Sequence, residues 1–153
     1  MREALRAHWP EYLMEAWGLG TFMISAGAFV TLIEYPGSPV QQAIAGPDIR
    51  RALIGLAMGL TAIGIIYSPW GQRSGAHINP SVTLTFLRLG KVAPWDALFF
   101  ILAQFIGGIL GMLGMALVLD NTFTDPLVAY VAKVPGPASV WVAFVAELLT
   151  RWG

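Results

Sequence analysis

Charge and cysteine are both scarce in this sequence. Charged residues make up 12% of the 153 positions and cysteine is absent, so neither a disulfide framework nor a thiolate metal site can form. Lysine and arginine together number nine, as do aspartate and glutamate, and the formal net charge of zero predicts no nucleic-acid partner. Hydrophobic residues make up 56% of the chain, which excludes an ordinary soluble domain and indicates one membrane-embedded unit over residues 1–153.

Histidine is nearly absent as well. His8 and His77 are the only two, and neither stands in a group of His, Asp or Glu residues with the spacing of metal ligands. We therefore predict no metal site and no cofactor.

Three apolar stretches are long enough to cross a bilayer as helices, over about residues 12–33, 52–67 and 95–119. The apolar part of a fourth stretch, residues 139–153, would make a helix of roughly 20 Å, which is too short to cross comfortably. We expect it to be the start of a further helix. Together these stretches predict an all-α, multi-pass protein of the cell membrane.

Cationic residues favour one orientation of these spans, because lysine and arginine are enriched in cytoplasmic loops. The larger group lies on the side of the N-terminus and consists of Arg2, Arg6, Arg73, Arg88 and Lys91. The opposite side holds Arg50, Arg51 and Lys133. This difference predicts a cytoplasmic N-terminus.

Residues 74–83, Ser-Gly-Ala-His-Ile-Asn-Pro-Ser-Val-Thr, lie between the second and third apolar stretches. Asn79 is a favourable N-cap, and Pro80 suits the first position of a helix. A helix over residues 79–88 is roughly 15 Å long, about half of a hydrocarbon core of roughly 30 Å. We expect a re-entrant half-helix that enters the membrane and has its positive dipole end near the middle.

The tip of such a half-helix has four backbone N–H groups without helical partners. In hydrocarbon each would cost several kcal/mol, so non-helical backbone at this depth needs protein or a water-filled cavity beside it. We interpret the tip as one wall of a polar pore, with the carbonyl groups of residues 75–78 along the approach. Donors at the tip and acceptors beside it suit a neutral hydrogen-bonding solute, such as water or a small polyol.

The motif at residues 74–83 resembles the first signature loop of the major intrinsic protein family, the aquaporins and aquaglyceroporins, although Ser81 replaces the usual alanine of Asn-Pro-Ala. Three further segments are similar to that family. They are Glu15-Ala16-Trp17-Gly18-Leu19-Gly20-Thr21-Phe22, Ala103-Gln104-Phe105-Ile106-Gly107-Gly108 and Phe144-Val145-Ala146-Glu147-Leu148-Leu149-Thr150. The resemblance covers nearly all of the chain, in order.

The resemblance implies the first half of an inverted repeat, in which two half-helices meet at the membrane centre, followed by the start of the second half. It implies a passive channel for water or small neutral solutes such as glycerol, excluding ions and protons, and a homotetramer in the lipid bilayer. The implied pore-lining residues are Gly75, Ala76, His77, Ile78, Asn79, Pro80, Ser81 and, on the second span, Met58 or its neighbour Gly59. The implied loop-bracing residues are Glu15, Gln104 and Glu147.

Two of these side chains have a second interpretation. Glu15 lies one turn inside the first span and could extend toward the membrane surface, although a carboxylate within a membrane is costly enough to indicate a partner. Gln104 could join two helices without bracing the loop.

Small residues recur at the four-residue spacing that membrane helices use to approach closely. Gly55 and Gly59 show this spacing in the second span, and Ala103, Gly107 and Gly111 show it in the third. The pattern predicts helix packing at these two surfaces.

Three alternatives to the channel remain open. The chain could be a truncated, transport-inactive fragment, because the fourth helix stops within the bilayer, or two copies could pair in opposite orientations. An intramembrane hydrolase would use Ser74 or Ser81 with His77, but no acidic residue is placed to orient the histidine. We therefore predict that the chain is not an enzyme.

Overall fold

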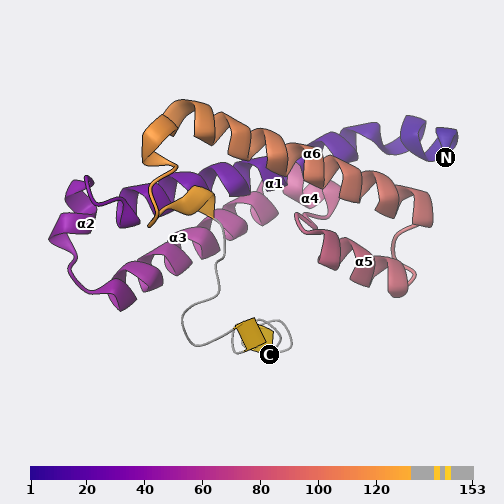
Figure 1. Cartoon of the computed structure of the whole chain (residues 1–153). Coiled ribbons are helices and arrows are strands. Elements are labelled where there is room, and N and C mark those ends of the chain that lie inside the picture. The colour runs from indigo at the N-terminus through magenta and orange to yellow at the C-terminus, as the bar shows by residue number, and fades with distance from the viewer. Residues whose placement is uncertain (132–139, 142–143, 146–153) are drawn as a thin grey trace.

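The computed structural model describes residues 1–131 and residues 140, 141, 144 and 145, and all of its regular elements there are helical (Figure 1). The α-helices are α1 (Arg2–Glu34), α2 (Pro39–Ala43), α3 (Pro47–Tyr67), α4 (Pro69–Ser74), α5 (Pro80–Arg88) and α6 (Pro94–Leu119), followed by the 3₁₀ turns η1 (Asp120–Thr122) and η2 (Ala129–Val131). Most of the predicted fourth stretch, residues 139–153, lies outside the described residues.

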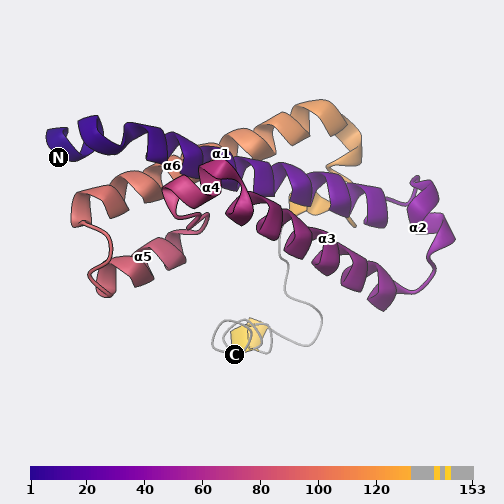
Figure 2. The same cartoon turned by 180° about the vertical axis from the view of Figure 1, so that it is seen from behind.

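Three of the helices, α1, α3 and α6, are long and apolar enough to cross a membrane. This confirms the prediction of an all-α membrane protein with three spans in this part of the chain. Figures 1 and 2 show α1 and α6 side by side and running in the same direction, while α3 returns in the opposite direction. The short helices α4 and α5 lie between the end of α3 and the start of α6.

Two spanning helices extend beyond the apolar stretches predicted to cross the membrane. α1 starts at Arg2 instead of residue 12, and α3 starts at Pro47 instead of residue 52. The extra part of α1 is bent at His8 (φ −124°, ψ 16°), two residues before Pro10, whose ring disturbs the preceding turn. Hydropathy marks only the part of a helix that lies in hydrocarbon, and both helices continue into their polar flanks.

The predicted half-helix corresponds to α5, for which Asn79 is the N-cap and Pro80 the first residue. The Asn79 side-chain oxygen accepts a hydrogen bond from the Ser81 amide at 2.8 Å. Nine residues give α5 a length of about 14 Å. The same kind of signal precedes α4, which the sequence analysis missed: Ser68 caps that helix by accepting from the Gly71 amide at 2.9 Å.

Glycine determines how closely α1 and α6 approach. A Cβ atom added to Gly107 would lie 1.9 Å from the carbonyl oxygen of Ala16, and one added to Gly111 would lie 2.6 Å from that of Gly20. The two backbones therefore touch without intervening side chains. In contrast, Gly55 and Gly59 of α3 have no atom of another group within 4 Å of such a Cβ, so this surface of α3 is unpacked in the described structure.

A small hydrophobic cluster joins the ends of α1 and α6. Met115, Phe123 and Val128 are buried, and Val30 and Tyr35 pack against them. The chain after α6 thus folds back over the end of α1, which places η2 beside that helix.

The contact at Gly107 predicts a position-specific effect of one methyl group. Gly107→Ala should lower the free energy of unfolding by about 1–3 kcal/mol or more, because the added carbon overlaps the Ala16 carbonyl and the two helices must separate. Gly114→Ala on the same helix meets nothing within 4 Å and should change it by no more than about 1 kcal/mol. Unfolding of both variants in mixed detergent micelles measures the difference. Equal stabilities would contradict the backbone contact.

Candidate functional site

The carboxylate of Glu15, on α1, is fully buried and accepts four hydrogen bonds. Oε1 accepts from the hydroxyl of Ser74 at 2.8 Å and from the amide of His77 at 2.9 Å. Oε2 accepts from the amide of Ile78 at 2.7 Å and from Nε2 of Gln104 at 2.8 Å. All four donors are uncharged, so hydrogen bonds rather than a cation replace the hydration of this group.

The loop of residues 75–79, between α4 and α5, turns the amide groups of His77 and Ile78 toward Glu15. Gly75 (φ 92°), Ala76 (φ 44°) and Ile78 (φ 38°) have positive φ angles, a conformation in which successive N–H groups point into one concavity and bind an anion. Here the anion is a side chain of the same molecule. Positive φ at a residue with a side chain costs roughly 1–3 kcal/mol, which the hydrogen bonds to the carboxylate offset.

The carbonyl groups of residues 75–78 differ from these amide groups in their hydrogen bonding. In the part of the chain that the structure describes, none of them accepts a hydrogen bond, whereas the amides of residues 76, 77 and 78 all donate to Ser74 or Glu15. The amides of residues 76–78 are therefore bonded within the protein, whereas the carbonyls of residues 75–78 have no partner among the described residues.

A second layer of polar contacts lies behind the loop. Gln104 of α6 is fully buried, and its Nε2 donates both to Glu15 and to the hydroxyl of Thr83 at 3.1 Å. The same hydroxyl lies 3.1 Å from Nδ1 of His77. Gln104 thus joins α6 to α1 and α5 and reaches the loop only through Glu15 and Thr83. Its Oε1 is buried and has no partner among the described residues.

Thr83 is missing from the predicted site residues. It is fully buried on α5, although the sequence marks it only as the last residue of the motif at 74–83. The signal that could have identified it is its position four residues after Asn79, which brings its hydroxyl to 3.3 Å from the N-cap carbonyl. No local pattern shows that Gln104 also contacts it.

The imidazole of His77 is buried and packed between aromatic rings. It stacks on Phe86 with ring centroids 4.9 Å apart and lies 5.2 Å from Phe100. A pore-lining role for His77 is therefore restricted to its main chain. The pairing of Ser74 with His77 that the hydrolase alternative would use is not formed, because the Ser74 hydroxyl bonds to Glu15 and the imidazole bonds to Thr83.

The remaining predicted residues are exposed or partly exposed in the part of the chain that the structure describes. Gly75, Asn79 and Ser81 are exposed, while Ala76, Ile78, Pro80 and, on α3, Met58 are partly exposed. Glu147, the third predicted bracing residue, lies outside the described residues. Within residues 1–131 no three His, Asp or Glu side chains come close enough to bind a metal ion.

Comparisons of the sequence with known proteins point to one family. The family model described as Major intrinsic protein matches residues 6–152. An aquaporin of Encephalitozoon hellem is 40% identical over 81 residues, which are 50% of this chain and 32% of the relative. Aquaporin Z of Photorhabdus laumondii is 38% identical over 86 residues (55% and 36%), and human aquaporin-5 is 40% identical over 75 residues (49% and 27%). The matched part thus spans about a third of these relatives, and no solved structure matches the chain.

The four hydrogen bonds predict that one oxygen of Glu15 cannot be replaced by an NH₂ group. Glu15→Gln turns a donor toward two existing donors, and at about 1–3 kcal/mol for each unmade bond it should destabilise the protein by about 2–6 kcal/mol. Unfolding in mixed detergent micelles measures this value. Amide exchange at residues 77 and 78 should accelerate in parallel.

Glu11→Gln is the matched control. Glu11 pairs with Arg73 at 2.9 Å, and the arginine side chain is 57% exposed, so removing this ion pair should cost less than about 1 kcal/mol. Similar losses for the two variants would contradict a special role of the Glu15 carboxylate.

Proposed function

Because this chain belongs to the major intrinsic protein family, we propose that it forms a passive transmembrane channel for water and small neutral solutes such as glycerol. Its relatives are named aquaporins, and three of its helices are long and apolar enough for a multi-pass membrane protein. The proposal rests on the backbone of the loop. The amides of residues 76–78 donate hydrogen bonds within the protein, whereas the carbonyls of residues 75–78 accept none from the described residues.

The available carbonyls supply the acceptors that a desolvated neutral solute needs. A water molecule or polyol that leaves bulk solution loses hydrogen bonds, and a row of carbonyl oxygens replaces part of them without a strong binding site. Irregular backbone at membrane depth is stable where it faces such an aqueous path. Pore width and lining groups of this kind are the general explanation of selectivity, for which aquaporin-type pores are themselves a standard example.

The N-terminal end of α5 carries partial positive charge, opposite in sign to the carbonyl oxygens of the loop. Helix dipoles place the equivalent of roughly half a positive charge at this end, and the exposed Asn79 side chain can donate there while its oxygen caps the helix. A cation that approaches the tip meets repulsion and loses its hydration shell, whereas a neutral solute does not. We therefore assign exclusion of cations and protons to this end of α5.

We also propose in which membrane the channel lies, how it is oriented and how it assembles. The chain lies in the cell membrane with a cytoplasmic N-terminus, and it assembles with further copies of itself as a tetramer. Transport of this kind makes and breaks no covalent bond, so it needs neither a catalytic residue nor a cofactor.

The channel proposal predicts faster osmotic flow. Liposomes that contain the 153-residue chain should shrink several-fold faster in an impermeant osmolyte than protein-free liposomes, as measured by stopped-flow light scattering. A glycerol gradient in place of the osmolyte separates water from solute passage. Shrinkage at the protein-free rate, with circular dichroism showing folded helices in the same vesicles, would contradict the proposal.

Charge at the tip of α5 predicts a change in selectivity. Asn79→Asp keeps the oxygen that caps the helix but adds a negative charge beside the positive end, so potassium leakage through the protein should rise while water flow persists. Ser81→Ala, at the neighbouring exposed position, adds no charge and is the control. A fluorescent potassium indicator inside the liposomes measures both. Equal leakage in the two variants would show that cation exclusion does not depend on this tip.

A further inference from the structure

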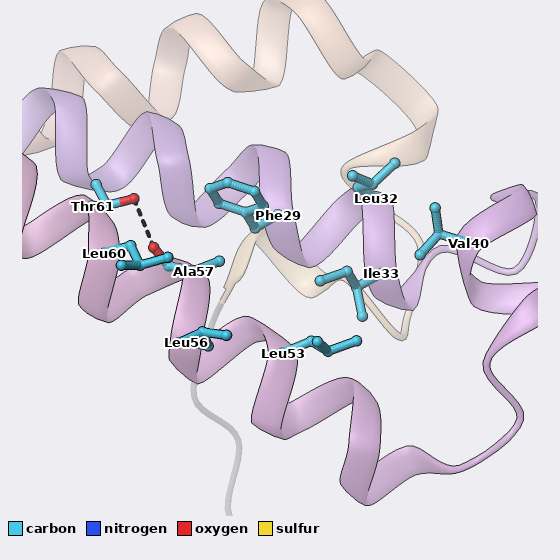
Figure 3. Close-up of a pocket in the computed structure, with 9 residues that line it drawn as sticks. All are labelled: Phe29, Leu32, Ile33, Val40, Leu53, Leu56, Ala57, Leu60 and Thr61. Atoms are coloured by element: carbon cyan, nitrogen blue, oxygen red, sulfur yellow. Dashed lines mark hydrogen bonds between the residues drawn. The ribbon is translucent and has the colours of Figure 1, made fainter.

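Gly18 of α1 is buried at the point where α1, α3 and the loop of residues 75–79 meet. On the side of α2 an apolar cleft separates the two helices, and Phe29 faces Leu56 across it (Figure 3). At Gly18 the helices are in contact. Ile65 of α3 is 4% exposed there, and its Cγ2 atom would lie 3.4 Å from a Cβ atom added to Gly18.

Ile78 of the loop leaves no room for a side chain at Gly18. A Cβ atom added to Gly18 would lie 2.7 Å from Cγ2 of Ile78, whereas ordinary van der Waals contact begins at 3.4 Å. Cγ2 is bonded directly to Cβ, and a β-branched side chain is stiff about χ1. A methyl group at position 18 would therefore displace the backbone of Ile78 as well as its side chain.

The backbone of Ile78 depends on two contacts with α1. Its φ angle is 38°, and positive φ at a β-branched residue is a genuine outlier, because Cβ crowds the following carbonyl oxygen. The Ile78 amide donates to Oε2 of Glu15 at 2.7 Å, and the Cγ2 methyl packs against Gly18. Glu15 and Gly18 are three residues apart, so one face of α1 holds both groups.

These contacts also determine the direction of the Ile78 carbonyl. The amide nitrogen, Cβ and the carbonyl carbon branch from one Cα atom, so fixing the first two fixes the third bond. The next residue, Asn79, is held by its own cap on α5, which restricts the remaining rotation about ψ. The Ile78 carbonyl is one of the four in the loop that accept no hydrogen bond from the described residues.

We propose that Gly18 is a positioning residue of the permeation path, whose missing side chain lets Ile78 pack on α1 and so directs the Ile78 carbonyl toward the passing solute. The inference rests on the proposed channel function. A polyol must meet several acceptors at once, whereas a water molecule can reorient at each of them. The position of this carbonyl therefore affects glycerol flow more than water flow.

Gly18→Ala tests this contact in liposomes. Glycerol flow should fall by about fivefold, the effect of weakening one hydrogen bond to the solute, and water flow should fall less. A loss of folded channels would lower both flows by the same factor, so the ratio of the two flows separates positioning from stability. Gly108→Ala is the control, because its added Cβ meets Leu19 of α1 at 3.5 Å, an ordinary contact. An unchanged ratio in Gly18→Ala would overturn the proposal.

The branch at Cβ of residue 78 supplies a second test. Ile78→Leu keeps the apolar volume but removes the methyl group that meets Gly18, whereas Ile78→Val keeps the branch. Combined with Gly18→Ala, the leucine should restore the flow ratio and the valine should not. If Gly18→Ala does not fold, recovery of folding with leucine alone supports the contact, and recovery with both or with neither overturns it.

Solid-state NMR observes the carbonyl without transport. Ile78-Asn79 is the only Ile-Asn pair in the sequence, so isoleucine labelled with ¹³C at the carbonyl and asparagine labelled with ¹⁵N give one carbon–nitrogen correlation in phosphatidylcholine vesicles. Its carbonyl frequency should shift in Gly18→Ala and stay constant in Gly108→Ala. Equal frequencies in Gly18→Ala and the unsubstituted chain would contradict the positioning role.

The two measurements distinguish this inference from the proposed function. An unsubstituted chain that conducts neither water nor glycerol would refute the channel. The carbonyl frequency would still decide whether Gly18 sets the position of Ile78.

Discussion

The buried carboxylate of Glu15 is the constraint on which the rest of the structure depends. A charge within a membrane helix is costly unless polar partners surround it, and here four uncharged donors from three separate segments converge on its two oxygens. Each donor is fixed by a local feature: Ser74 by the end of α4, the amides of residues 77 and 78 by the positive φ angles of Ala76 and Ile78, and Gln104 by α6. The hydrogen bonds to this one carboxylate thus determine the path of the loop.

The close approach of α1 and α6 makes this arrangement possible. Gly107 lies three residues after Gln104, and its backbone lies against the carbonyl of Ala16, the neighbour of Glu15. A larger residue at position 107 would move α6 outward and withdraw the Gln104 amide from Glu15 and Thr83 together. The close backbone packing at Gly107 and the hydrogen bonds of Gln104 one turn earlier therefore depend on each other.

The two ends of the molecule present opposite chemistry. At one end the amides of the loop face inward and its carbonyls remain available, which suits passage of a neutral hydrogen-bonding solute. At the other end α1 and α3 diverge around an apolar cleft, and the one hydroxyl in its lining is bonded internally.

The sequence by itself determined the three spanning helices and the start of α5. Long apolar runs and an Asn-Pro cap act through neighbouring residues, so their effect is readable from the order of the chain. The same reasoning applied to Ser68 and Pro69 would have found α4. The tertiary structure alone decided that Thr83 joins Gln104 and His77, that the His77 ring is enclosed by Phe86 and Phe100, and that α1 and α3 separate into a cleft. The physical reason is separation along the chain: Glu15 and Gln104 are 89 residues apart, and only the close contact of two helices brings their side chains to 2.8 Å.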